Sequence, residues 1–209
     1  GNTNIVLGIF DGETLSESWR LSTLSERTAD ELRVLVGRLF EERHLDMTGV
    51  SGVVLASVVP PLTATVTEMV RGAFGRETLA IDATNVGLPI EYQAPGDVGA
   101  DRLVNAVAAL DEFGGGARPI IVVDFGTATT FDVVDYKGAY KGGIIAPGIN
   151  LSLDALVAAA AKLPKIAIAP PENRSVIGRT TEAQMHIGVF WGYVAMMEGL
   201  VARIRAEIG

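Results

Sequence analysis

The segment Asp124-Phe125-Gly126-Thr127-Ala128-Thr129-Thr130 lies between two runs rich in β-branched residues, 119–123 (PIIVV) and 131–135 (FDVVD). This order predicts a strand, a tight turn and a returning strand. Such a turn offers backbone N–H groups and hydroxyls to an anion, and Asp124 at the strand end can hold a cation or a metal-bound water. The segment alone fits a phosphate clamp and an ordinary hairpin equally well, because short glycine motifs also match by chance.

A second stretch of the same plan stands at the start of the chain. Gly1-Asn2-Thr3-Asn4 precedes the apolar run 5–10 (IVLGIF), which ends at Asp11-Gly12. This internal similarity predicts two related lobes, each offering a hairpin turn to one end of a phosphate chain. The arrangement resembles the actin, hexokinase and Hsp70 superfamily of ATP-binding, ribonuclease H-like folds. The resemblance implies an α/β fold in which each lobe is a mixed sheet flanked by helices, with a cleft between the lobes.

Composition bounds the class of protein. The 209 residues are 48% apolar, enough for one large or two small cores. Without Cys, and with only His44 and His186 as imidazoles, a structural zinc site is nearly excluded. The net charge of -8 and the lack of a Lys/Arg cluster argue against nucleic-acid binding. We find no signal peptide and no apolar run near the length of about 20 residues that spans a membrane, so we expect a cytoplasmic protein without membrane contact.

Apolar periodicity predicts alternating strands and helices, which favours an α/β domain over a bundle. In the first half we expect strands at 17–23, 50–59, 79–81 and 88–92, and helices at 27–43, 62–74 and 101–113. The triple glycine 114–116 ends the last of these helices and predicts a lobe boundary, giving lobes 1–115 and 116–209.

The second half continues the pattern. We expect a strand at 141–148, helices at 150–162 and from about 179 onward, and a short strand at 165–168. Gly142-Gly143 and Pro147-Gly148 predict a close backbone approach, to another element more often than to a nucleotide. Either Thr180 or Thr181 can cap the last helix. That helix carries an apolar stripe that predicts core packing first and a dimer seam second: Tyr193, Met196, Met197, Leu200, Val201 and Ile204.

The loop 93–102 (QAPGDVGADR) places Asp101 and Arg102 in the first turn of a predicted helix. A carboxylate is favoured there by the helix dipole, and free N–H groups can meet an anion. Spacing alone favours an ordinary helix-start carboxylate for Asp101, a surface charge for Arg102 and packing for Tyr92. Neither His has a partner at metal-ligand or triad spacing, and the chain has no GxSxG, Walker-type or GxGxxG motif.

Taken together and in order, the motifs are similar to those of type III pantothenate kinases, over essentially the whole chain. They are Gly1–Asn4, Tyr92, Pro95-Gly96, Gly99–Arg102, Asp124–Thr130, Gly142-Gly143, Pro147-Gly148, and Ile177–Arg179 with Thr181. The resemblance implies phosphorylation of pantothenate at its terminal hydroxyl by ATP, giving 4'-phosphopantothenate in the first step towards coenzyme A. Such an enzyme is a phosphotransferase with an alcohol acceptor.

Carried over residue by residue, the resemblance implies Asp101 as the general base. The pantothenate site would be lined by Tyr92, Gly99, Ala100 and Arg102. Thr181 would reach into that site from the other subunit of a homodimer. The ATP phosphates, with Mg²⁺, would meet Gly1, Asn2, Thr3, Asn4, Ile5, Val6 and Thr127. Asp124 would bind the K⁺ or NH₄⁺ that the family requires.

Two departures accompany the resemblance. The family carries an Asp two residues before the first Gly of the Gly1–Asn4 motif, and we expect that strand to be missing from this chain. Thr180 stands where many relatives have Asn. The alternative function is a catalytically silent relative acting as a transcriptional accessory or regulatory protein, and a third is another phosphotransferase or phosphohydrolase of the superfamily. A silent relative has no reason to keep both Asp101 and Asp124, which favours the kinase.

Overall fold

The computed structural model describes residues 2–114, 118–171 and 175–209, and its contacts divide the chain into two compact units, Gly1–Ala108 and Ala109–Gly209. Each unit is described by itself. The division falls within one helix, a few residues before the predicted triple-glycine boundary. Of that boundary, Gly115 and Gly116 lie outside the described residues, as does Gly1.

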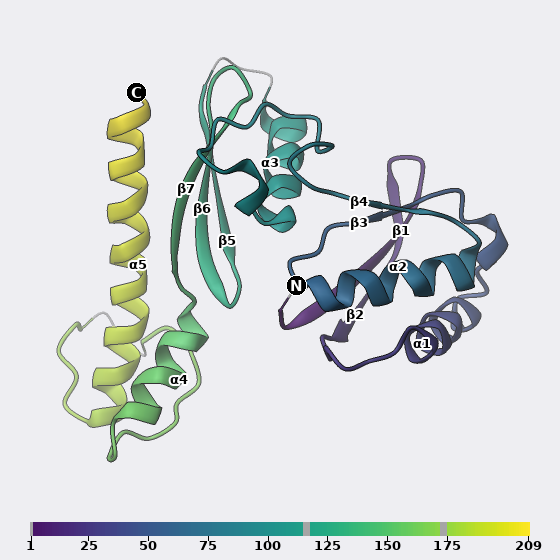
Figure 1. Cartoon of the computed structure of the whole chain (residues 1–209). Helices are drawn as coiled ribbons and strands as arrows, with labels where there is room; N and C mark the ends of the chain where they lie inside the picture. The colour runs from purple at the N-terminus through teal and green to yellow at the C-terminus, as the bar shows by residue number, and fades with distance from the viewer. Residues whose placement is uncertain (1, 115–117, 172–174) are drawn as a thin grey trace. The chain divides into compact units, whose positions relative to one another are not determined.

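The first unit contains an antiparallel hairpin, a parallel pair of short strands and three α-helices (Figure 1). In chain order the elements are β1 (Asn4–Asp11), β2 (Thr14–Ser22), α1 (Ala29–Glu42), the 3₁₀ turn η1 (Met47–Gly49), β3 (Val53–Leu55), α2 (Pro60–Phe74), β4 (Thr78–Ala80), the 3₁₀ turn η2 (Pro95–Asp97) and α3 (Ala100–Phe113), which continues into the second unit. Gly12 turns the hairpin with a φ of 59°, a conformation that glycine adopts without a steric cost.

The core of the first unit explains the alternation in β1. Alternate residues Ile5, Leu7 and Ile9 pack against buried side chains of α1 and α2, while the intervening Val6 and Phe10 are each 62% exposed. The buried set is Leu32, Val36, Phe40, Leu62, Met69 and Val70. One face of the hairpin is therefore the inner layer of this unit, as the period of two in a strand requires.

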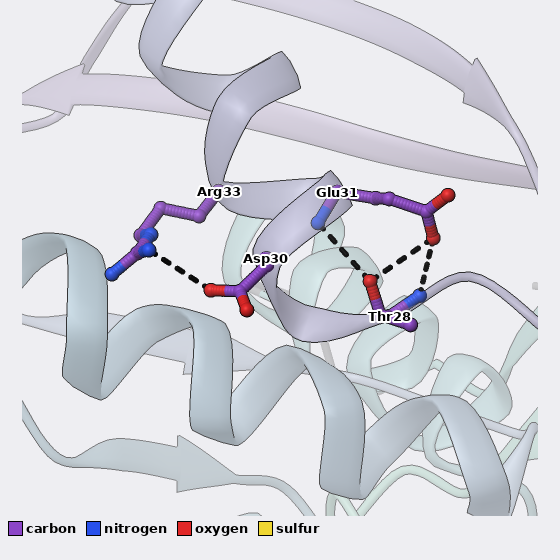
Figure 2. A network of polar contacts seen from close by, with 4 residues as sticks. All are labelled: Thr28, Asp30, Glu31 and Arg33. Atoms are coloured by element: carbon purple, nitrogen blue, oxygen red, sulfur yellow. Dashed lines mark hydrogen bonds and ion pairs between the residues drawn. The ribbon is translucent and has the colours of Figure 1, made fainter.

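Helix α1 begins with a reciprocal cap (Figure 2). The Glu31 N–H donates to the Thr28 hydroxyl at 3.2 Å, and the Thr28 N–H donates to the Glu31 carboxylate at 2.7 Å. The Thr28 N–H and the Thr28 hydroxyl, which donates to the same carboxylate at 3.1 Å, hold the pKa of Glu31 below its ordinary value, the backbone bond being the larger cause. Asp30 and Arg33 form an exposed ion pair one turn further on, which contributes little to stability.

The second unit is a three-stranded antiparallel sheet with two helices (Figure 1). Its elements are β5 (Ile120–Phe125), β6 (Ala128–Val134), β7 (Tyr140–Pro147), α4 (Ile149–Ala159) and α5 (Thr181–Ile208). The apolar stripe predicted in the last helix packs on one face of β6, around buried Phe131, Val133 and Ile204. Met197, Leu200 and Val201 join this cluster, so the core interpretation of the stripe is confirmed for these residues.

Helix α5 has 28 residues and a most apolar window of mean hydropathy 1.3, so by length and composition alone it could cross a membrane. The expectation that no segment of the chain reaches this length was therefore wrong. A core helix passes the same test, and part of the composition of α5 is explained by its packing on β6.

Several predicted strands differ from those observed. The strand predicted at 50–59 is only Val53–Leu55, because a turn follows in which the Val59 N–H donates to the Ser57 hydroxyl, and Pro60 then begins α2 instead of ending a strand. The segments 88–92 and 165–168 form no strand. In the latter, Ile166 is buried beside Leu153 and Met185, so its apolar side chains pack without a backbone partner.

The sheets also differ from the mixed sheets that we predicted. Within the described residues, the first unit has one antiparallel and one parallel pair, and the sheet of the second unit is antiparallel throughout. Helix α4 ends at Ala159, three residues before the predicted end at 162.

Candidate active site

The central hairpin is tighter than the sequence predicted. Strand β5 runs to Phe125 and β6 begins at Ala128, so only Gly126 and Thr127 form the turn. The Gly126 N–H donates to the Ala128 carbonyl at 2.9 Å. Thr127 is exposed at the tip, where its hydroxyl can reach a ligand. The predicted strand, turn and returning strand are confirmed.

Gly148, the N-cap residue of α4, supports this turn through its backbone. The Gly148 N–H donates to the Thr127 carbonyl at 3.0 Å. A Cβ at Gly148 would lie 2.3 Å from the Gly126 carbonyl oxygen and 2.5 Å from that of Thr127, so only glycine allows this approach. Gly143 is similar, since its Cβ would lie 1.7 Å from the Phe131 carbonyl oxygen. Both close approaches are to neighbouring backbone, which confirms the packing interpretation of these glycines.

One face of this sheet carries a row of polar side chains. Asp124 lies opposite Thr130 in the β5–β6 register, and Asp132 follows two residues along the same face. The Thr130 hydroxyl donates to the Asp132 carboxylate at 3.1 Å, and the fully buried Asp132 also accepts from the Tyr140 hydroxyl at 2.7 Å. Asp124 itself is exposed. The row thus runs from a buried, hydrogen-bonded carboxylate to an accessible one.

The opposite face of β6 carries a different polar contact. Thr129, 1% exposed, forms a hydroxyl–hydroxyl hydrogen bond with Tyr193 of α5. The Tyr193 hydroxyl also donates to the Pro147 carbonyl at 3.1 Å. Sequence analysis placed Tyr193 in the apolar stripe and missed this contact, and it likewise gave Asp132 no role. A polar residue inside the β-branched run 131–135 was the available signal for Asp132.

In the first unit, Asp101 lies in the first turn of α3, as predicted. Its carboxylate accepts the Arg102 N–H at 2.8 Å and is partly buried. A Cβ at Gly99 would lie 2.6 Å from this carboxylate oxygen and 3.1 Å from Val58 Cγ1. The side chain of Asp101 therefore occupies the space that the missing side chain at position 99 leaves open.

The other predicted residues are distributed over both units. Asn2 and Thr3 are exposed before β1, which begins at Asn4, and Ile5 and Val6 lie within it. Tyr92 is 41% exposed, and Ala100 is buried next to Asp101. Thr181 begins α5, and Thr180 is its cap, accepting the Ala183 N–H at 3.1 Å. The structure thus brings Gly99–Arg102 together in one unit and Asp124 with Thr127 in the other, while no contact joins Thr181 to either group among the described residues.

The residues suit oxygen-loving cations and phosphate. Carboxylate and hydroxyl oxygens are the ligands that Mg²⁺ and monovalent cations take in proteins, and Asp124 and Thr130 present such oxygens on one face. Within the described ranges no three His, Asp or Glu side chains gather into a cluster.

Comparison with known proteins gives the family. The family model described as type III pantothenate kinase matches residues 1–203. Proteins named type III pantothenate kinase are 53% identical to this chain in Rhizorhabdus wittichii, 53% in Paramagnetospirillum magneticum and 47% in Moorella thermoacetica. These alignments cover 100% of this chain and 80%, 79% and 81% of the relatives. The chain belongs to the type III pantothenate kinase family. As predicted, it is a kinase, and the family implies an actin-like ATPase fold.

A solved structure of a Campylobacter jejuni protein, assigned to the Baf family of transcriptional activators, is similar in fold to this type III pantothenate kinase. The TM-score is 0.54 over 95% of this chain and 75% of that chain, at 16% sequence identity. At that identity the likeness concerns the fold alone. The relatives near 50% identity are all named as kinases, so the alternative of a transcriptional accessory protein is not favoured.

Proposed function

We propose how the residues of this pantothenate kinase divide the work of phosphorylating pantothenate with ATP, the reaction that begins coenzyme A biosynthesis. The proposal depends mainly on one observation, the carboxylate of Asp101 held in the first turn of α3 by the Arg102 N–H. A carboxylate fixed by one oxygen keeps its second oxygen available to accept a proton.

Asp101 is the general base of the proposed mechanism. It accepts the proton of the terminal pantothenate hydroxyl while that oxygen attacks the γ-phosphorus of ATP. The bond from the γ-phosphorus to the β–γ bridging oxygen breaks, and ADP leaves with the electron pair. Proton acceptance of this kind contributes a factor of about 10² to 10⁴ in rate. Tyr92, Gly99, Ala100 and Arg102 are the proposed pantothenate contacts.

The phosphates are assigned to the segment Gly1–Val6 and to the turn at Thr127. Phosphoryl transfer depends mostly on positioning and on neutralising charge, and a turn braced by Gly148 is a rigid support for both. Mg²⁺ bound with ATP supplies most of that neutralisation. Asp124 is the proposed ligand of K⁺ or NH₄⁺, because its carboxylate is the exposed end of the polar row on β5 and β6.

The proposal includes two related lobes, 1–115 and 116–209, that close on ATP from either side of a cleft. It also includes a cytoplasmic homodimer in which Thr181 of one subunit contacts the pantothenate of the other. The exposed position of Thr181 at the start of α5 supports this contact.

The test is Asp101→Asn in the full-length protein, with ADP release measured as a function of pantothenate. An Asn keeps the acceptor for the Arg102 N–H but takes up a proton poorly, so we expect kcat to fall about 10² to 10⁴-fold at an unchanged Tm. Asp97→Asn is the matched control, because Asp97 is an exposed carboxylate in the same loop. Ordinary turnover of the Asp101→Asn enzyme would refute the general-base role.

A further inference from the structure

We infer that Tyr193 is a positioning residue of the kinase, whose hydroxyl fixes the phosphate turn at Gly126 and Thr127 from the side of α5. The inference rests on the proposed role of this turn in holding ATP phosphates. It concerns contacts within the second unit only, between α5, the start of β6 and the end of β7.

The direction of the hydrogen bonds follows from the atoms involved. A tyrosine hydroxyl has one proton, and a carbonyl oxygen only accepts. Since Tyr193 donates to the Pro147 carbonyl, its oxygen must accept from the Thr129 hydroxyl. The series of hydrogen bonds therefore runs from Thr129 through Tyr193 to Pro147, and joins the start of β6, which follows the turn, to the end of β7.

Thr129 and Pro147, the residues at the two ends of this series of hydrogen bonds, both lie close to the turn in the sequence or to the glycine that supports it. Thr129 opposes Phe125 in β5 and Ala146 in β7, so its position affects where the end of β5 and the end of β7 lie beside β6. Pro147 precedes Gly148, whose N–H donates to the Thr127 carbonyl. Displacing either strand end would alter the backbone at the turn directly.

The packing of α5 on β6 holds the Tyr193 hydroxyl in place for these hydrogen bonds. Tyr193 and Met197 are one turn apart on α5, and Met197 packs with Ile204 against Phe131 of β6. Tyr193 therefore lies at the end of the apolar stripe of α5, and its hydroxyl lies where this stripe meets Thr129. A residue at position 193 that only filled the core would need no hydroxyl, because the residue at position 129 could then be apolar as well.

The experiment compares Tyr193→Phe with two control variants that also lose one phenol hydroxyl. Tyr140→Phe removes a buried hydroxyl bonded to Asp132, near the opposite end of β7 from the turn, and Tyr136→Phe removes an exposed one. We expect Tyr193→Phe to raise the KM for ATP about tenfold, the loss expected for hydrogen bonds of this kind, and to leave the KM for pantothenate within twofold. Tyr140→Phe should lower Tm without changing the KM for ATP.

A double-mutant cycle sharpens the test. Thr129→Val removes one of the two bonds made by Tyr193, so its effect on the KM for ATP should be smaller than that of Tyr193→Phe. The double variant should be no worse than Tyr193→Phe alone, because the two side chains act through one hydroxyl. If the double variant raises the KM for ATP by the product of the two single effects, the inference is wrong.

Thr127→Val separates this inference from the proposed function. If Thr127→Val leaves the KM for ATP unchanged, the turn does not hold the phosphates and the proposed function is wrong at this point. If Thr127→Val raises that KM while Tyr193→Phe lowers only Tm, or only kcat for both substrates alike, then Tyr193 is merely structural and this inference alone fails.

Discussion

Replacing Gly99 by Ala tests whether this glycine is required by the position of the general base. A Cβ at residue 99 would lie 2.6 Å from a carboxylate oxygen of Asp101, whereas ordinary contact begins at 3.4 Å. The carboxylate must therefore withdraw by about 0.8 Å, the difference of these two distances. The second neighbour, Val58 Cγ1 at 3.1 Å, needs to yield only slightly.

The cost should fall on catalysis and spare folding. The displaced atom is the end of a rotatable side chain, so the protein can accommodate it and we expect Tm to fall by no more than about 2 °C. A shift of about 1 Å in a reacting group can cost about 10²-fold in rate. We therefore expect kcat for Gly99→Ala to fall about 10²-fold, approaching the rate of Asp101→Asn.

The assay is steady-state ADP release by Gly99→Ala, Asp101→Asn and the double variant, with Tm measured for each. If Gly99 acts through Asp101, the double variant should be no slower than Asp101→Asn. Two results would refute the reasoning: kcat for Gly99→Ala within threefold of the parent, or rate losses that multiply in the double variant. The latter would favour a direct contact of residue 99 with pantothenate.

Gly148→Ala differs from Gly99→Ala, because its Cβ would meet backbone oxygens that have no way to rotate aside, and we expect Tm to fall by about 5 °C together with a higher KM for ATP. Asp124→Asn should abolish activation by K⁺ over Na⁺ while Tm in Na⁺ is unchanged, and an undiminished K⁺ response would contradict the cation role. Thr28→Ala should lower Tm by about 2–4 °C at pH 7. Because the pKa of Glu31 is lowered by its bonds to Thr28, this stabilisation is present above the ordinary Glu pKa and is lost as the pH falls through the lowered value. Thr28→Ala keeps the backbone N–H that donates to Glu31 and loses the hydroxyl bond to the same carboxylate, so the Tm difference between this variant and the parent should narrow in part in acid. A difference that widens in acid would contradict this role of the cap.

Local pattern was sufficient for the hairpins and the long helices, and insufficient for the short strands. The β-branched runs beside Gly126 and Thr127 predicted β5 and β6 because each strand finds its partner across a tight turn. The apolar residues at 88–92 and 165–168 look the same in sequence, but among the described residues the first makes only a single bridge, at Ile90, and neither segment forms a strand. Whether a short apolar run becomes a strand depends on a partner distant in the chain, and a local pattern holds no information about it.

The site residues show the same limit at the level of single atoms. The tyrosine at 193 fits an apolar period, and the period predicts correctly which way its ring points. Its hydroxyl partner, Thr129, is 64 residues away, and no spacing rule connects the two. Likewise the sequence marks glycines 143 and 148 only as places of close approach, and the family resemblance marks Gly99 only as a pantothenate contact. The structure distinguishes a glycine that makes room for a movable carboxylate from two that make room for fixed backbone.

The difference between a movable side chain and fixed backbone as the neighbour of a glycine determines how the kinase tolerates substitutions. Transfer of a phosphoryl group gains its rate mainly from groups held in place before the reaction, so a support made of backbone is worth more than one made of flexible side chains. The turn at Thr127 has such a support in Gly148, and the Tyr193 hydroxyl joins the start of β6, which follows the turn, to the end of β7. Asp101 instead depends on one hydrogen bond and on an empty space beside it. The general base is therefore the more easily displaced part, and substitutions around residue 99 should impair turnover well before they impair folding or ATP binding.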